Sequence, residues 1–160
     1  MNEFHKGQQV IHCRDGLSVI VEQTVISDNP YFVLKAIRGG GENIYVSVER
    51  AAMSIRPLMN SEEADKLLES AKAVAFEFNP NTKQRRDGLK RRLASGDVND
   101  VVYLFKQYYY YKKNNDPSIK YGPVDIEMLE YASNNLLDEL AIAYNKHRDE
   151  IEEFAFKKLV

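Results

Sequence analysis

The sequence is poor in the residue types that build disulfide frameworks and metal centres. Its 160 residues contain one cysteine, three histidines and no tryptophan. The single cysteine, Cys13, cannot form an internal disulfide, which is typical of chains that fold in a reducing compartment. No apolar run reaches the roughly 18 residues of a membrane span, and residues 1–6 contain no apolar signal core. We therefore expect a soluble, cytoplasmic protein that does not enter a membrane.

The residue patterns that carry catalysis are also missing. His12 and Cys13 are adjacent in an expected strand, so their side chains point to opposite faces and do not readily share a metal ion or form a nucleophilic pair. Gly39-Gly40-Gly41 is not followed by Lys-Ser or Lys-Thr, so a hairpin turn is a better interpretation than a phosphate loop. The carboxylates lie on expected helix faces. We predict no enzyme, no catalytic residue, no metal and no cofactor, unless the fold gathers carboxylates or histidines in a polar cleft.

Residues 8–48 have the pattern of an antiparallel sheet. Short runs rich in valine, isoleucine and threonine alternate with turn signals that contain glycine, proline, asparagine or aspartate. Four such strands joined by tight turns predict a small barrel or sandwich. The expected strands are 10–11, 17–26, 31–37 and 44–48.

From residue 61 onward the apolar residues recur at helical spacing. Asn60 and Glu63 form a capping-box pattern at the first helix, and Pro123 suits the first turn of a long helix. The fold class is therefore α+β, with about five helices after the sheet. We place the domains at residues 1–58 and 59–160. The expected helices are 61–74, 82–94, 97–114, 123–145 and 147–160.

Charge is distributed unevenly along the chain. The net charge is −2, but residues 83–120 carry 10 basic and 4 acidic side chains, whereas residues 121–160 carry 4 and 9. The basic helix from Lys83 to Arg92 holds six cations and one acid. It is either a solvated helix face or a surface that binds an anion such as nucleic acid. The candidate residues are Lys83, Arg85, Arg86, Lys90, Arg91 and Arg92.

Four consecutive tyrosines, Tyr108–Tyr111, offer aromatic rings that could stack on bases. Four successive residues cover every side of a helix, however, so at most two of them can face one partner. Packing between helices is therefore the favoured interpretation, and base stacking stays open as the alternative.

Several segments in colinear order resemble the CarD/CdnL/TRCF family of bacterial transcription regulators. The opening Phe4-x-x-Gly7-x-x-Val10-Ile11 and the run Tyr31-Phe32-Val33-Leu34-Lys35 are similar to the first strands of the family. Ile55-Arg56-Pro57-Leu58 resembles its hinge into the first helix. The segment Leu93-Ala94-Ser95-Gly96-Asp97-Val98 resembles its Ser-Gly-Asp signature. The last long helix is matched by Met128-Leu129-Glu130-x-Ala132.

The resemblance implies a function without catalysis. It implies a Tudor-like N-terminal domain that docks on the RNA polymerase β subunit, and a helical domain that meets promoter DNA at the upstream edge of the transcription bubble. The protein would then modulate the stability of the open complex, as a monomer. The polymerase contacts would fall on Thr24, Ile26, Tyr45 and Ser47, and the DNA contacts on the six cations of the basic helix.

The chain departs from the family pattern at three places. Gln8 and His12-Cys13 replace the usual residues of the opening motif. Thr24 and Tyr45 stand where some members have basic residues. The tryptophan that often wedges into the bubble edge is absent, and Phe78 is the possible substitute. A protein-only adaptor, whose helical domain binds another protein instead of DNA, is therefore the alternative function.

Overall fold

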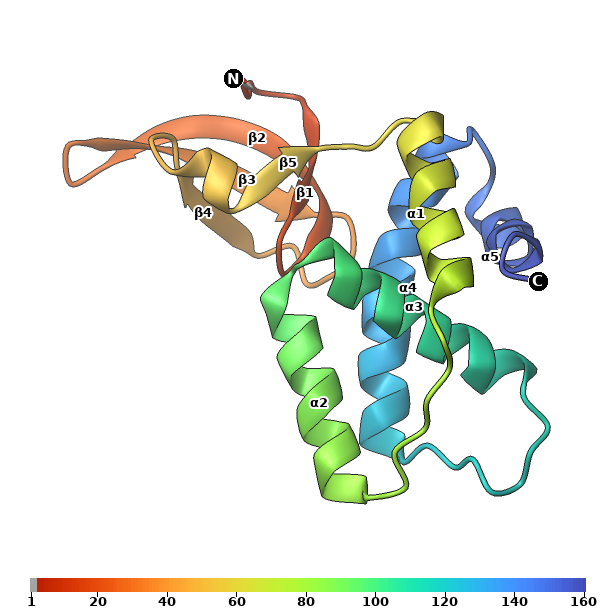
Figure 1. The fold of residues 1–160 in the computed structure, drawn as a ribbon. Helices are drawn as coiled ribbons and strands as arrows, with labels where there is room; N and C mark the ends of the chain where they lie inside the picture. The colour runs from red at the N-terminus through yellow and green to blue at the C-terminus, as the bar shows by residue number, and fades with distance from the viewer. Residues whose placement is uncertain (1–2) are drawn as a thin grey trace. The chain divides into compact units, whose positions relative to one another are not determined.

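The computed structural model describes residues 3–160, which form two compact units with the boundary between Met59 and Asn60 (Figure 1). The first unit is an antiparallel sheet with one short 3-10 helix, and the second unit is entirely helical. The predicted α+β class, with strands first and helices after, is confirmed. Each unit is described below by itself.

The sheet has the strand order β4-β3-β2-β1-β5, and every neighbouring pair is antiparallel. The strand β5 was not predicted, because three residues that end in a proline carry no readable alternation. The elements of this unit are β1 (Gln9–His12), β2 (Gly16–Ile26), β3 (Asn29–Ala36), β4 (Asn43–Ser47), the 3-10 helix η1 (Ala51–Met53) and β5 (Ile55–Pro57).

One face of this sheet carries the core of the first unit. Apolar residues at alternating positions of neighbouring strands pack together there, because side chains along a strand alternate between its two faces. Ala51 from η1 closes the cluster, and Phe4 packs edge-on against Phe32. The buried residues are Val10, Ile20, Phe32, Leu34, Val46, Ala51 and Ile55.

The helices of the second unit agree with the predicted ranges to within a few residues. Asn60 accepts from the Glu63 backbone N–H at 2.8 Å while the Glu63 carboxylate accepts from the Asn60 N–H at 3.1 Å, so the predicted capping box is confirmed. The helices are α1 (Ser61–Ala73), α2 (Thr82–Ser95), α3 (Val98–Lys113), α4 (Pro123–Ala143) and α5 (Arg148–Lys157).

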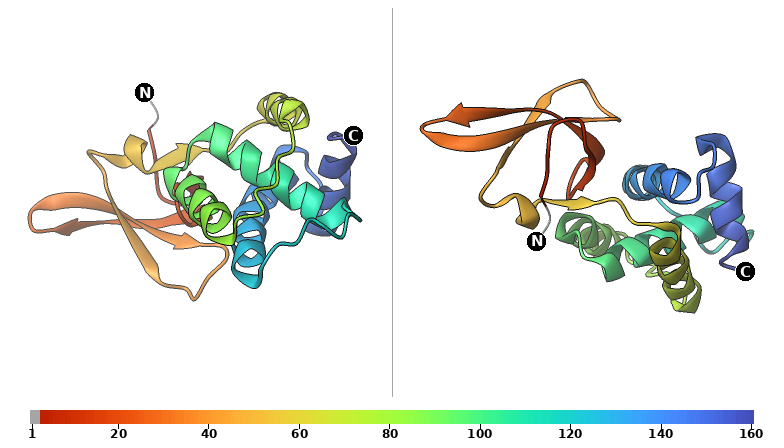
Figure 2. Two further views of the ribbon diagram at one scale, coloured as in Figure 1. Left: turned by 60° about the horizontal axis from the view of Figure 1, so that its bottom comes forward. Right: turned by 90° about the horizontal axis from the view of Figure 1, so that it is seen from above.

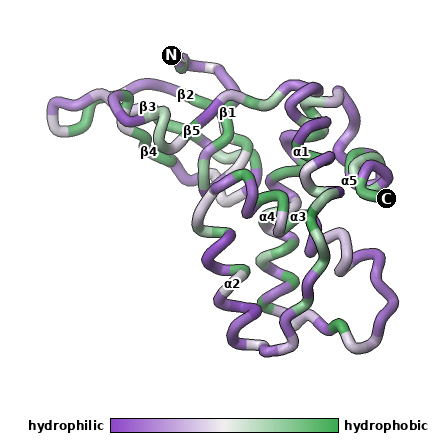
Figure 3. Tube along the Cα trace, viewed as in Figure 1, coloured by the Kyte–Doolittle hydropathy of each residue, from purple (hydrophilic) through white to green (hydrophobic). Residues whose placement is uncertain are grey.

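Helix α3 is central to the second unit. It packs against α1, α2 and α4, and α4 also packs against α5 (Figures 1 and 2). The apolar positions of α3 and α4 contrast with the largely hydrophilic α2 (Figure 3). Phe105 of α3 lies against Phe156 of α5, with ring centroids 5.8 Å apart. Within the described residues, no helix is long and apolar enough to span a bilayer.

The tyrosine run is part of this packing. Tyr108 is buried, and its hydroxyl donates to Glu152 at 2.7 Å. The ring of Tyr110 stacks on Phe76 at 3.9 Å between centroids, and Tyr109 meets Phe156 edge-on. All four rings of Tyr108–Tyr111 make intramolecular aromatic contacts, as the packing interpretation predicts.

Candidate nucleic-acid and partner-binding surfaces

The basic residues lie on α2, which is held by few apolar contacts. Asn81 caps its start by accepting from the Gln84 N–H at 2.9 Å, and Gly96 ends it with a φ of 67° that favours glycine. Leu89 is the one fully buried residue of α2 (Thr82–Ser95). The helix is therefore fixed mainly by what its charged residues contact.

Arg85 is a buried structural residue. Its Nε donates to Asp125 Oδ2 of α4 at 2.8 Å, and the two side chains are 8% and 2% exposed. A second guanidinium nitrogen donates to the Asn79 carbonyl at 2.9 Å, and the guanidinium lies 4.9 Å from the centre of the Phe78 ring. The prediction that Arg85 belongs to an exposed anion-binding surface is therefore wrong.

Arg92 is also occupied within the molecule. Its guanidinium donates to Asp100 of α3 at 2.7 Å and lies 3.7 Å from the centre of the Tyr103 ring. Arg92 is about one third exposed. Arg85 and Arg92 thus join α2 to α4 and α3, and we leave both out of the candidate DNA-contacting set.

The remaining four cations of α2 are exposed. Lys83 pairs with Asp87 at 3.1 Å one turn along the helix, where both side chains are largely in solvent. Arg86, Lys90 and Arg91 have no ion-pair partner among residues 3–160. A polyanion would therefore meet three uncompensated positive charges, which we call the α2 cation set.

Phe78 does not project as a wedge. Its half-buried ring lies edge-on to Tyr121, with centroids 5.2 Å apart, and its other contact is the Arg85 guanidinium. The hydroxyl of Tyr121 in turn donates to Gln107 Oε1 at 2.5 Å. Since these contacts hold Phe78 within the helical unit, we do not carry the wedge hypothesis further.

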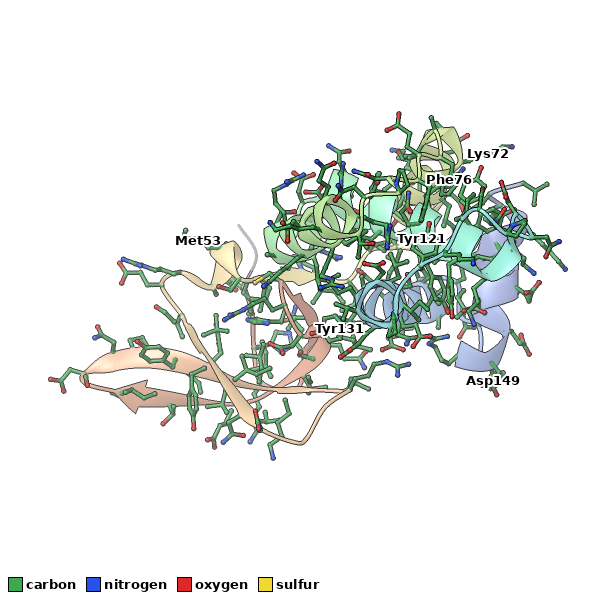
Figure 4. The ribbon with its side chains drawn as sticks, turned by 90° about the horizontal axis from the view of Figure 1, so that it is seen from below. Met53, Lys72, Phe76, Tyr121, Tyr131 and Asp149 are labelled. Carbon is green, nitrogen blue, oxygen red and sulfur yellow. The ribbon has the colours of Figure 1, made fainter. Side chains whose placement is uncertain are left out.

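Two buried polar residues of α3 hold the segment between α1 and α2. Lys106 Nζ donates to the Lys72 carbonyl at 3.0 Å, at the end of α1, and Gln107 Nε2 donates to the Glu77 carbonyl at 3.0 Å. Burial lowers the pKa of Lys106, and the Lys72 charge lowers it further. Lys72, in the last turn of α1, and Phe76, in the segment that follows, are labelled in Figure 4. Sequence reasoning missed both residues, since a polar residue in an apolar helix carries no signal of its partner.

The four predicted polymerase-contacting residues lie on one face of the sheet. Thr24 pairs with Tyr31, and Tyr31 pairs with Ser47, so the three side chains form one cross-strand row. Ile26 is two residues beyond Thr24, and Tyr45 is two residues before Ser47, so both share that face. It is the face opposite the core. Tyr45 and Ile26 are exposed there.

Strand β4 is an edge of the sheet with free backbone groups. The Val48 N–H donates to the Pro30 carbonyl at 3.1 Å, so Val48 and Pro30 form a hydrogen-bonded pair of the antiparallel ladder between β3 and β4. Because such pairs alternate along an antiparallel ladder, the Tyr45 and Ser47 backbone groups point away from β3. The Ser47 carbonyl accepts from the Arg50 N–H. Within residues 3–160, the Tyr45 N–H, the Tyr45 carbonyl and the Ser47 N–H have no partner strand and can pair with an incoming one.

His12 is the last residue of β1 and Cys13 begins the turn that follows, so the prediction that both lie in one strand is wrong for Cys13. His12 is buried and Cys13 is exposed. The Nδ1 atom of His12 lies 2.8 Å from Asp15 Oδ2, and burial lowers the His12 pKa even though the Asp15 charge acts in the other direction. Across residues 3–160, no group of three histidine, cysteine, aspartate or glutamate side chains could hold a metal ion.

Comparison with known families identifies the helical unit. The model of the CarD C-terminal domain matches residues 66–155, which extend from α1 into α5 and make up more than half of the chain. The chain belongs to the CarD family. A search of curated proteins found no match. The protein is therefore a CarD-like, transcription-associated protein of a regulatory, non-enzymatic family.

The aromatic packing of this CarD helical unit predicts a destabilisation at alkaline pH. Burial raises the pKa of Tyr108, Tyr121 and Tyr144 above the ordinary 10.0, helped for Tyr108 and Tyr144 by hydrogen bonds to carboxylates. As the pH rises, these three tyrosine hydroxyls therefore lose their protons at a lower pH in the unfolded chain than in the folded protein. The contribution of the three protonated tyrosines to the free energy of unfolding is complete below pH 10 and is lost as the pH rises above 10.

We expect the ultraviolet absorbance of tyrosinate to show that these three tyrosines ionise later than the others during an alkaline titration. Three of the ten tyrosines should ionise only together with the loss of helical circular dichroism. Tyr144→Phe should reduce the number of late-ionising tyrosines, measured from the tyrosinate absorbance, by one. A titration that completes while the helices are still intact would contradict the prediction.

Proposed function

We propose that this CarD-family protein regulates transcription by docking on the RNA polymerase β subunit and contacting promoter DNA near the upstream edge of the bubble. The sheet unit would bind the polymerase through strand β4, with Thr24, Ile26, Tyr45 and Ser47 at the contact. The helical unit would hold DNA phosphates through α2. The protein would thereby modulate the stability of the open complex.

The observation that carries the DNA half is the α2 cation set. Arg86, Lys90 and Arg91 are exposed on a helix whose only acid, Asp87, is already paired with Lys83. Exposed cations without internal partners supply sequence-independent phosphate contacts and release counterions on binding. The side chain of Lys83 is 88% exposed and can join them.

The free edge of β4 supports the part of the proposal that concerns docking on the polymerase. An edge strand, which is paired on one side only, can accept a further strand from a partner, and the backbone hydrogen bonds then provide affinity. The neighbouring side chains Thr24 and Tyr45 on the outer face would add specificity.

Charge reversal on α2 tests the DNA half. We expect Arg86→Glu with Lys90→Glu to weaken binding to any duplex and to reduce the slope of log affinity against log salt by about 2, because each phosphate contact contributes roughly 0.9. The matched control is Lys66→Glu with Lys157→Glu, which makes the same charge change on α1 and α5. Equal slopes for the α2 variant and the parent would contradict the assignment.

A protein-only adaptor is the second candidate function. It is favoured by the enclosure of Phe78 between Tyr121 and Arg85, which removes the candidate wedge named from the sequence. In that case the sheet unit would still dock a partner, and DNA binding by the parent protein would be absent or insensitive to salt.

A further inference from the structure

Gly88 lies in the middle of α2, where neither backbone conformation nor packing requires a glycine. Its backbone is not among the positive-φ residues, whereas Gly96 at the end of the same helix is. A Cβ atom built at Gly88 meets nothing within 4 Å. Neither the helix geometry nor the packing of the described residues therefore requires glycine at this position.

Glycine weakens a helix interior relative to alanine, because it has more backbone freedom to lose on folding. Helix α2 has little apolar packing to offset this, since Leu89 is its one fully buried residue. The remaining physical use of a bare backbone is to let a ligand approach the helix main chain closely.

The residues around Gly88 indicate what could approach. Gln84, Arg91 and Ser95 are four residues before, three after and seven after Gly88, so they lie on the same side of the helix. All three are exposed. Arg85 and Arg92, three residues before and four after Gly88, bound this side where α2 packs against α4 and α3, and the side has no apolar side chain and no carboxylate. Ser95 is occupied with Asp100, whereas Arg91 has no ion-pair partner among the described residues. We call this side the Gly88 face.

We propose that the Gly88 face of α2 lies directly against a phosphate backbone, with Arg91 bound to a phosphate and Gly88 leaving room for the contact. The inference rests on the proposed DNA binding by α2 and specifies its geometry. Arg86 and Lys90, two residues before and two after Gly88, lie on the opposite side of α2 and contact neighbouring phosphates through their long side chains. A polar, cationic face without apolar side chains fits a nucleic acid better than a protein.

Substitutions that add volume at Gly88 test the proposal. We expect Gly88→Ala to raise the melting temperature of the full-length protein while lowering its affinity for a random-sequence DNA duplex. Gly88→Leu should lower the affinity by at least about tenfold, as expected for loss of a charge-assisted contact. A stabilised variant with weaker binding cannot be explained by unfolding. The matched control is Ala94→Leu, which adds similar volume at an exposed position on the Lys90 flank and should change affinity less than about twofold.

The outcomes separate this inference from the proposed function. If Gly88→Leu binds like the parent while Arg86→Glu with Lys90→Glu binds weakly, α2 contacts DNA but the Gly88 face does not, and the inference is wrong. If Ala94→Leu weakens binding as much as Gly88→Leu, the contact is not specific to this face, and the inference is also wrong. If the parent protein does not bind the duplex, both proposals fail.

Discussion

Replacing Asp125 by alanine should lower the free energy of unfolding of the helical unit by about 3–5 kcal/mol, because it leaves the Arg85 guanidinium buried without its counter-ion. The Asp125 carboxylate also accepts from the Gly122 N–H at 2.9 Å, so the substitution removes the cap of α4 as well. Urea unfolding followed by circular dichroism at neutral pH measures the change.

Two matched variants make this prediction specific. Asp87→Ala removes the acid of an exposed ion pair on α2 and should cost no more than about 0.5 kcal/mol. The double change Arg85→Met with Asp125→Leu removes both buried charges and should recover most of the stability lost in Asp125→Ala. If Asp125→Ala were no more destabilising than Asp87→Ala, the buried pair would not hold α2 on α4.

Tyr45→Pro should strongly weaken the proposed docking on the RNA polymerase β subunit while leaving the protein folded. Proline removes the outward N–H of Tyr45, and its ring obstructs a strand that pairs with β4. An edge strand tolerates proline where its N–H faces solvent, so the sheet itself should survive. We expect affinity to fall by at least about tenfold, since the change removes a backbone hydrogen bond and adds a steric clash.

The control for this effect is Tyr45→Ala, which removes the side chain but keeps the backbone N–H. It should bind more tightly than Tyr45→Pro, and both variants should melt within a few degrees of the parent. Equal affinities for the two variants would contradict strand pairing at β4 and would leave a contact made by side chains alone.

The parts of the fold that sequence could predict are those with local signals. Alternation, turn residues and caps located the strands β1 to β4 and all five helices. Strand β5 carries no such signal, because its three residues are defined by pairing with β1, more than forty residues earlier in the chain. Its position depends on a long-range contact that no local pattern specifies.

The candidate DNA-contacting residues show the same limit. Helical spacing groups the six cations of α2 by direction but cannot tell which of them meet a partner within the protein. Arg85 and its partner Asp125 are 40 residues apart, and Arg92 pairs across a helix boundary with Asp100. The aromatic neighbours of Phe78 and Arg92 are likewise set by the packing of helices, so only the structure separates the structural arginines from the exposed ones.

The most direct test of the account is a calorimetric titration of the full-length protein with the isolated N-terminal lobe of the host polymerase β subunit. The account predicts one-to-one binding with a dissociation constant in roughly the micromolar range, typical of transient regulatory contacts of moderate size. The heat should be unchanged when Arg86→Glu with Lys90→Glu is used in place of the parent, because α2 is assigned to DNA. Absence of binding at concentrations of about 100 µM would contradict docking on the polymerase and would place the adaptor function first.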